Sequence, residues 1–375
     1  MTGRLQVGAR VALVLAAASA AAMSSQSRPR ARDVGLVVGR LPAGPNDAVT
    51  DVPGVKVGHR TLREGESIRT GVTVVLPHGG NPFREKVPAA LAVGNAFGKF
   101  VGSTQLAELG TLETPVALTS TLSIWAAADG LVDWVLSLPG NEDVRSVNPV
   151  VGECNDGFLS DIRARAVRAE HVREAIEAAK DGPIEEGSVG AGTGTLCLGW
   201  KGGIGTSSRR TKEGAEGFTV GVLVQTNFGG DLTVLGVSLG EKLRASREKS
   251  DRDGSCVFVV ATDAPLDARQ LGRLARRALG ALPRVGARLS HGSGDYALAF
   301  STGWVDPAGR RRDPAPSPLP EDRLDPLFTA ALDASEEAIL NSLLRATTVE
   351  GFEGRRAEAV PIEPLLEAVR AGRGW

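Results

Sequence analysis

The hydrophobic pattern of the chain changes most abruptly around residue 255. Residues 246–253 are all charged or polar, whereas residues 256–260 form an unbroken apolar run that contains three valines. Such a run is typical of a strand that is buried on both faces. Only Gly254 and Ser255 separate the two segments. The pattern therefore predicts an exposed loop that leads directly into a buried strand with a serine at its head.

The rest of the chain predicts blocks of strands and blocks of helices. Helical spacing of apolar residues predicts helices, and short apolar runs bounded by turn residues predict strands. Because the blocks do not alternate strictly, a layered α+β sandwich is favoured over a doubly wound parallel sheet. The predicted strands are 71–76, 89–93, 256–260 and 295–302, with further β segments in 188–205 and 218–230; the predicted helices are 119–138, 161–179, 266–282, 327–346 and one that starts near Pro361.

Composition describes a globular protein without an extended basic surface. Of the 375 residues, 42% are hydrophobic and 23% are charged, which is enough to build a substantial core. The formal net charge is -1, and Lys and Arg are spread along the chain. Nucleic acids and anionic membranes bind surfaces with clustered positive charge, so neither partner is expected. The 47 glycines and 4% aromatic residues suit a sheet-rich protein with tight turns.

Most chemistry-bearing motifs are absent or occur in the wrong context. The three cysteines and four histidines contain neither a C-x-x-C nor an H-E-x-x-H spacing, so we expect no metal and no cofactor. The G-x-S-x-G elbow of the α/β-hydrolases does not occur, and Ser246-x-x-Lys249 lies in the charged run. The glycine-rich segment 190–205 matches neither nucleotide-binding pattern.

The amino-terminal residues have the pattern of a secretory signal peptide. Arg4 and Arg10 precede an apolar stretch, 11–22, that ends in an A-x-A site. We therefore expect residues 1–22 to be removed and the protein to be periplasmic or secreted. The alternative is a mis-assigned start or an Ala-rich tail on a cytoplasmic protein. No other stretch reaches the roughly 20 apolar residues that a membrane-spanning helix requires.

The Gly254-Ser255 pair has two possible roles. It is either a turn glycine followed by a strand-initial serine, or a site of autoproteolysis. In the second case the serine hydroxyl attacks the carbonyl before it, and hydrolysis of the resulting ester frees Ser255 as a new chain terminus. Glycine tolerates the backbone strain of that attack. The new terminal amine has an ordinary pKa of about 7.7–8.0, so nucleophile and base can belong to one residue.

Six segments in a fixed order carry a family resemblance. They are VVGECNDGFLSDIR (150–163), GTGTLCLGWKGGIGTSSR (192–209), VLVQTNFG (222–229), DGSCVFVVATDAPL (253–266), HGSGDYALAFST (291–302) and EEAILNSLL (336–344). From about residue 33 to its end, the chain resembles the self-processing aminopeptidases, which include L-aminopeptidase/D-amidase-esterases and β-peptidyl aminopeptidases.

The resemblance implies one domain, 33–375, with a four-layer αββα sandwich similar to N-terminal-nucleophile hydrolases but with different strand connectivity. The precursor would be cut at Gly254-Ser255 into an α chain that ends at 254 and a β chain, 255–375. The processed αβ units of relatives assemble as tetramers, so a homo-oligomer is expected. Substrates would be small peptides, amides or esters with a free amino terminus.

The resemblance also assigns roles to individual residues. Ser255 matches the family's nucleophile, and Ser293 and Asp295 match its G-S-G-[DE] motif; positions two apart in a strand share one face. Asn227 matches the oxyanion donor. Glu153 falls where relatives hold the substrate's ammonium group, and Asn155 stands where some relatives have a tyrosine that lines the site.

Several alternatives stay open at this level. The working base is either the terminal amine or the Ser293-Asp295 pair, because a nearby carboxylate would favour the ammonium form of the amine. Cys256 is expected to pack in the core, and the family mechanism needs no histidine, His291 included. The rival functions are acyl transfer of the ornithine acetyltransferase type, which uses a threonine at the cut site, and an uncleaved binding protein. The preference for L-, D- or β-amino acids is not encoded in any motif.

Overall fold

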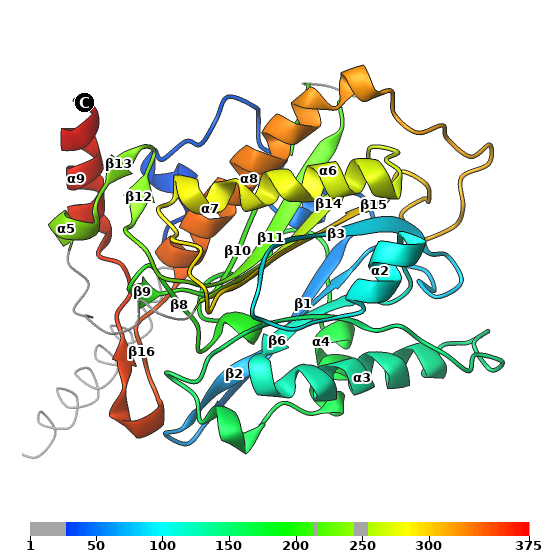
Figure 1. The fold of residues 1–375 in the computed structure, drawn as a ribbon, viewed down its shortest axis with the longest axis horizontal. Helices are drawn as coiled ribbons and strands as arrows, with labels where there is room; N and C mark the ends of the chain where they lie inside the picture. The colour runs from blue at the N-terminus through cyan, green and yellow to red at the C-terminus, as the bar shows by residue number, and fades with distance from the viewer. Residues whose placement is uncertain (1–27, 213–216, 244–253, 375) are drawn as a thin grey trace, which may run out of the picture.

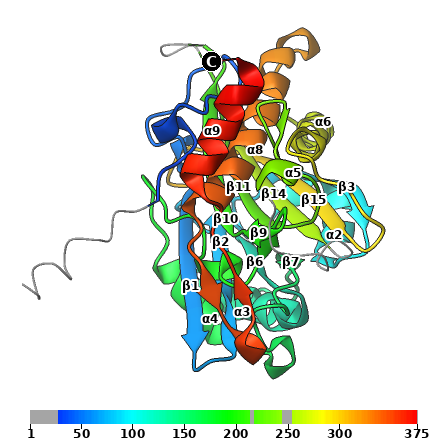
Figure 2. The ribbon, with the colours of Figure 1, turned by 90° about the vertical axis from the view of Figure 1, so that its left-hand side faces the viewer.

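Two β-sheets lie face to face at the centre of the molecule, and helices cover both outer faces (Figure 1, Figure 2). The computed structural model describes residues 28–212, 217–243 and 254–374. The predicted signal peptide, 1–22, lies outside the described residues. No helix in the described ranges is long and apolar enough to cross a membrane.

The first sheet has five strands in the order β1-β2-β6-β7-β4. Neighbouring strands are antiparallel except for the parallel pair β6 and β7. The strands are β1 (Lys56–Glu64), β2 (Ile68–Leu76), β4 (Phe100–Val101), β6 (Val116–Ser120) and β7 (Val150–Cys154).

The second sheet has six strands in the order β10-β11-β14-β15-β3-β5. Only β14 and β15 are parallel neighbours. The strands are β3 (Val87–Ala96), β5 (Thr111–Leu112), β10 (Ile204–Arg210), β11 (Thr219–Asn227), β14 (Ser255–Thr262) and β15 (Gly294–Ser301). The buried strand predicted from the apolar run is therefore β14, and it begins at Ser255 itself.

The helices α3 (Ile124–Ser137) and α4 (Ala169–Glu177) cover the first sheet, and α6 (Ala268–Leu279) and α8 (Asp325–Arg345) cover the second. The other helices are α2 (Ser103–Leu109), α5 (Gly240–Leu243), α7 (Ala281–Arg284) and α9 (Ile362–Arg373). Short strand pairs lie at the periphery: β8 (Leu196–Cys197) with β9 (Trp200–Lys201), β12 (Thr233–Val234) with β13 (Val237–Ser238), and β16 (Val349–Glu350) with β17 (Arg356–Ala357).

Three hydrophobic clusters fill the three spaces between these four layers. Strand β14 contributes to two of them, because Cys256 faces α6 and α8 whereas Val257 faces the other sheet. Successive side chains of a strand point to opposite faces, so Ser255 shares the face of Val257. These positions confirm the predicted αββα sandwich and the packing of Cys256 in the core.

The amino-terminal part of the described chain is held to helix α8 by polar contacts that are partly or fully buried. The Arg28 guanidinium donates to the carbonyl oxygen of Leu344 at 2.7 Å, and Arg32 pairs with Glu337 at 2.9 Å. Arg209 of β10 pairs with the same Glu337 at 2.5 Å, and both side chains are fully buried. These contacts join segments on both sides of the Gly254-Ser255 bond.

The predicted helix 161–179 is shorter than its apolar spacing suggests. Asp161 accepts a hydrogen bond from the backbone N–H of Arg163 and so caps a separate short turn, Ile162–Ala164. Arg165 follows with a φ of 48°, which a continuous helix does not allow. Helix α4 therefore begins only at Ala169. The helix predicted over 119–138 also begins later than expected. Residues 119 and 120 belong to β6, and α3 begins only at Ile124.

Candidate active site

The candidate site lies where three adjacent strands meet. Ser255 is the first residue of β14, and its register partners are Asn227, the last residue of β11, and Gly294, the first residue of β15. Figure 1 shows these three strands side by side in the second sheet. Asn227 and Ser255 are directly opposite in an antiparallel pair, so their side chains lie on one face of the sheet. Ser255 is buried, with 6% of its surface exposed.

The hydroxyl of Ser255 is placed against the carbonyl group that precedes it. Its Oγ donates to the carbonyl oxygen of Gly254 at 2.7 Å, and the backbone N–H of Gly294 donates to the same oxygen at 3.0 Å. A Cβ atom on Gly254 would lie 3.1 Å from Phe228 Cα and 3.3 Å from Ser293 Oγ. This close packing explains why a glycine precedes the serine.

Ser293 and Asp295 form a buried pair beside Gly254. Ser293 Oγ donates to Asp295 Oδ1 at 2.9 Å, and both residues are almost fully buried. Asp295 Oδ2 has no hydrogen-bond partner among the described residues. Burial raises the pKa of the Asp295 carboxyl to about 6, although the hydrogen bond from Ser293 opposes this rise. Ser293 Oγ therefore lies between a carboxyl group of elevated pKa and the Gly254 backbone.

A small cavity of about 10 Å³ adjoins this pair, which is room for about one water molecule. Ser290, Ser293 and Asp295 are the polar side chains of its lining, and the other lining residues are glycine or apolar. Its lining residues are Phe228, Gly229, Gly254, Ala287, Leu289, Ser290, Ser293 and Asp295.

The carboxamide of Asn227 has a fixed orientation. Its Oδ1 accepts a hydrogen bond from the backbone N–H of Leu196 at 3.0 Å. This bond distinguishes the oxygen from the nitrogen of the carboxamide, and the amide N–H groups remain as donors without an acceptor in the described part of the chain. They belong to a residue directly across the ladder from Ser255, as the sequence predicts for an oxyanion donor.

Glu153 lies at the end of β7 in the other sheet and is only 2% exposed. Its Oε1 accepts from the backbone N–H of Lys99 at 2.9 Å, and its Oε2 accepts from the hydroxyl of Thr121. A Cβ atom on Gly98 would lie 3.2 Å from both Glu153 Oε1 and Gly294 Cα. One glycine backbone therefore separates this carboxylate from the strand neighbour of Ser255.

Two residues considered from the sequence have different surroundings. Asn155 is exposed, and its Oδ1 accepts from the backbone N–H of Gly157 at 2.9 Å, which stabilises the turn after β7. His291 is also exposed, and its ring packs edge-on against Phe97 with the ring centroids 5.9 Å apart. Among the described residues, neither side chain forms a hydrogen bond with the Ser293-Asp295 pair.

Sequence reasoning missed the groups that hold Glu153 and Asn227 in place. The N–H groups of Lys99 and Leu196 are backbone donors, which cannot be recognised from the type of residue in the sequence. Thr121 was missed because the sequence predicts it inside the helix 119–138, whereas it directly follows the end of β6.

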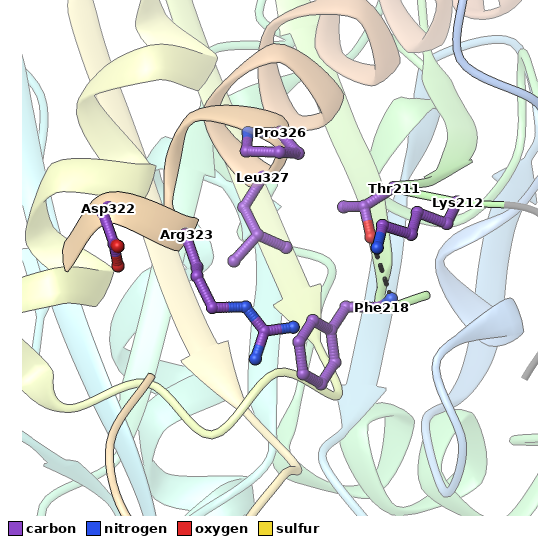
Figure 3. A pocket seen from close by; sticks show the side chains of 7 residues that line it. All are labelled: Thr211, Lys212, Phe218, Asp322, Arg323, Pro326 and Leu327. Atoms are coloured by element: carbon purple, nitrogen blue, oxygen red, sulfur yellow. Dashed lines mark hydrogen bonds between the residues drawn. The ribbon is translucent and has the colours of Figure 1, made fainter. Parts of the chain in front are cut away.

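A larger cavity, of about 230 Å³, lies at the opposite end of β11 (Figure 3). Phe218 and Leu327 form its apolar wall, and the guanidinium of Arg323 lies over the Phe218 ring at 6.0 Å from the centroid. Its charged side chains are exposed, and it contains no nucleophile with a paired base. Among the described residues, no group of three His, Cys, Asp or Glu side chains could hold a metal ion. The buried Ser293-Asp295 pair lies instead beside Gly254.

Comparison with known proteins gives consistent results. The chain is 39% identical over 389 residues to the β-peptidyl aminopeptidase BapA of Sphingosinicella microcystinivorans, with 96% of each chain covered. A β-aminopeptidase structure from Burkholderia sp. matches with a TM-score of 0.85 and 42% identity, over 92% of this chain and 99% of that one.

The L-aminopeptidase D-Ala-esterase/amidase of Ochrobactrum anthropi, described as a new variant among the Ntn-hydrolase fold, matches with a TM-score of 0.82 and 34% identity over the same shares of each chain. This likeness confirms the predicted N-terminal-nucleophile-like fold. The model of peptidase family S58 matches residues 47–357. The chain therefore belongs to peptidase family S58.

Proposed function

We propose that Ser255 is the nucleophile of this peptidase and that the chain generates it by cutting its own Gly254-Ser255 bond. The observation that carries the proposal is the 2.7 Å contact between Ser255 Oγ and the carbonyl oxygen of Gly254. In this contact the attacking oxygen already lies against the carbonyl group that it has to attack. A turn serine with a purely structural role has no need of the adjoining Ser293-Asp295 pair.

The cut has two chemical steps. In the first, Ser255 Oγ loses its proton and bonds to the Gly254 carbonyl carbon; the C–N bond then breaks, and the nitrogen takes a proton to become an amine. In the second, one water molecule attacks the ester, the C–O bond breaks, and Oγ regains its proton. The products are a carboxylate on Gly254 and a free amine on Ser255.

The base for self-cleavage has to be a group other than the nitrogen of Ser255. Before the cut the nitrogen of Ser255 is an amide, and an amide nitrogen does not accept a proton at ordinary pH. The Ser293-Asp295 pair is the basic group that adjoins Gly254. Ser293 Oγ takes the proton while it passes its own to Asp295. After the cut, the terminal amine becomes a second base for substrate hydrolysis.

The mature enzyme is an aminopeptidase and amidase, as its family and relatives indicate. Ser255 forms an acyl-enzyme, and water resolves it. The amide of Asn227 donates to the oxyanion, and Glu153 binds the free amino group of the substrate. Because an internal peptide bond has no ammonium group nearby, Glu153 restricts the enzyme to small peptides, amides and esters with a free amino terminus.

We also propose export and self-association of the processed protein. Arg4, Arg10 and the apolar stretch 11–22 support removal of a signal peptide. Three apolar side chains near the site, Val93, Phe97 and Leu289, are 53%, 61% and 44% exposed, which suits a contact between processed units. Amino-terminal sequencing of the secreted protein and light scattering test the two points separately.

Intact mass under denaturing conditions tests the main proposal. The wild-type protein should give two fragments, one of which begins at Ser255, and Ser255→Ala should give one uncut chain. The wild type should release p-nitroaniline from amino-acid p-nitroanilides, and N-acetylation of the same substrates should abolish turnover. A single uncut chain in both samples would overturn the nucleophile assignment and favour a non-catalytic binding protein.

A further inference from the structure

Ser255 is flanked by two hydrogen-bond donors of different kinds. On one side, β11 supplies the carboxamide of Asn227, and on the other, β15 supplies the backbone N–H of Gly294. Only the second donor is engaged with the bond that is cut. The carbonyl oxygen of Gly254 accepts from Gly294 at 3.0 Å, whereas Asn227 is not among its donors in the described chain.

We propose that the backbone N–H of Gly294 is the oxyanion donor of the self-cleavage reaction, and that Asn227 serves only the peptidase reaction. This inference rests on the proposed cut at Gly254-Ser255. When Ser255 Oγ bonds to the carbonyl carbon, the π electrons of the C=O bond move to the oxygen. Gly294 already donates to that oxygen, so the growing charge is stabilised without any rearrangement.

The fold supplies this donor through ordinary strand pairing. Strands β14 and β15 are parallel, with Ser255 opposite Gly294, and the bond from Gly294 to Gly254 extends their ladder by one residue. The pairing continues along eight residues, which holds the donor rigidly. A hydrogen bond of the sheet thereby also becomes part of the reaction site.

The identity of residue 294 is consistent with such a fixed donor. A Cβ atom on Gly294 would lie 2.8 Å from the Cα and 2.9 Å from the nitrogen of Gly98. The Gly98 backbone therefore packs directly on Gly294, and Tyr296 donates to the carbonyl oxygen of Gly98 at 2.8 Å. This contact restricts the movement of Gly294, the residue that carries the N–H.

The two donors would also act at different times, Gly294 before the cut and Asn227 after it. Once water has cleaved the ester, Gly254 carries a carboxylate and belongs to a different chain from Ser255. The Gly294 N–H then loses its covalently held partner. Asn227 keeps its orientation, because the hydrogen bond from Leu196 to its Oδ1 does not involve residue 254.

An amide-to-ester replacement tests the role of this single N–H. Glycolic acid at position 294, introduced by nonsense suppression in cell-free synthesis, exchanges the N–H for an oxygen and adds no side chain. Lactic acid at position 297 is the matched control, because it removes an interior N–H of the same strand. Fragment formation is followed by mass over time. Loss of one oxyanion donor should slow the cut about 10²–10³-fold at 294, and the control should be cut at close to the wild-type rate.

Asn227→Ala gives an independent readout that does not depend on the ester variants folding. It should self-cleave at nearly the wild-type rate and then hydrolyse p-nitroanilides with kcat lowered about 10²–10³-fold. Equal slowing by the two esters, a wild-type rate for the ester at 294, or an uncut Asn227→Ala would overturn the separation of roles. An uncut wild-type chain would instead overturn the proposed function itself.

Discussion

At the scale of single residues, the two oxygens of Asp295 have unequal surroundings. Oδ1 accepts from Ser293, and Oδ2 is buried without a partner among the described residues. Burial favours the neutral acid, which is why the pKa of this carboxyl rises to about 6. In the uncut chain no terminal amine is present to reverse that effect. The protonation state of Asp295 therefore decides whether the pair can accept a proton.

Self-cleavage should consequently have an acid limb near pH 6. Because the pKa is raised, the carboxylate is depleted as the pH falls through 6, and the rate should drop about tenfold for each further pH unit. Freshly synthesised precursor, held at a series of pH values and followed by fragment mass, gives the profile. Asp295→Asn should be slow and lack this limb. A rate that stays level to pH 4 would contradict the assigned base.

The residues that the sequence could predict are those whose partners are fixed by strand pairing. Ser255 heads a segment with a clear strand pattern and Ser293 directly precedes another, so the pairing of Ser255 with Gly294 brings Ser293 near the start of β14. The contacts of Glu153 could not be predicted in the same way. They involve the backbone of Lys99 and the hydroxyl of Thr121, and their approach depends on how the two sheets stack.

At the scale of elements, Gly254 lies where the ends of three strands converge. Phe228 follows β11, Ser293 precedes β15, and each lies close to the position that a side chain on Gly254 would occupy. Strand ends are held by their own ladders, so these neighbours have little freedom to move apart. A Cβ atom at 254 would therefore crowd Phe228 and Ser293 beside the Gly254-Ser255 bond.

Gly254→Ala should slow self-cleavage about tenfold or more. Overpacking of this kind typically costs about 1–3 kcal/mol, and about 1.4 kcal/mol corresponds to a factor of ten in rate. Gly272→Ala is the control, because the nearest atom to its new Cβ lies 3.7 Å away. The fragment-mass time course compares the two. If Gly254→Ala is cut as fast as Gly272→Ala, the convergence of strand ends has no bearing on the reaction.

Element type was largely predictable, and element boundaries were not. The apolar run after Ser255 and the amphipathic spacing of 266–282 correspond to β14 and α6. The segment 161–179 has the same helical spacing as α6, yet its first part is not α-helical, because Asp161 caps a short 3-10 turn instead. Such competition between a side chain and the helix is decided by local geometry that periodicity does not contain.

At the scale of the whole molecule, the cut would divide the chain without dividing the fold. In the second sheet, β14 and β15 belong to the carboxyl-terminal part, and their neighbours β11 and β3 belong to the amino-terminal part. Helix α8 is held by Arg28, Arg32 and Arg209 from across the cut. The two fragments should therefore co-migrate in native size-exclusion chromatography and separate only in denaturant.

Because strands from both fragments are interleaved in the second sheet, the cut protein should refold less readily than the uncut chain. An uncut chain such as Ser255→Ala refolds as one molecule, so its refolding rate should not depend on protein concentration. Two separated fragments have to meet before β14 can pair with β11. Their recovery becomes a second-order reaction in competition with aggregation. The lifetime of the cut enzyme would then be set by its rate of unfolding, and the barrier that protects it would be kinetic.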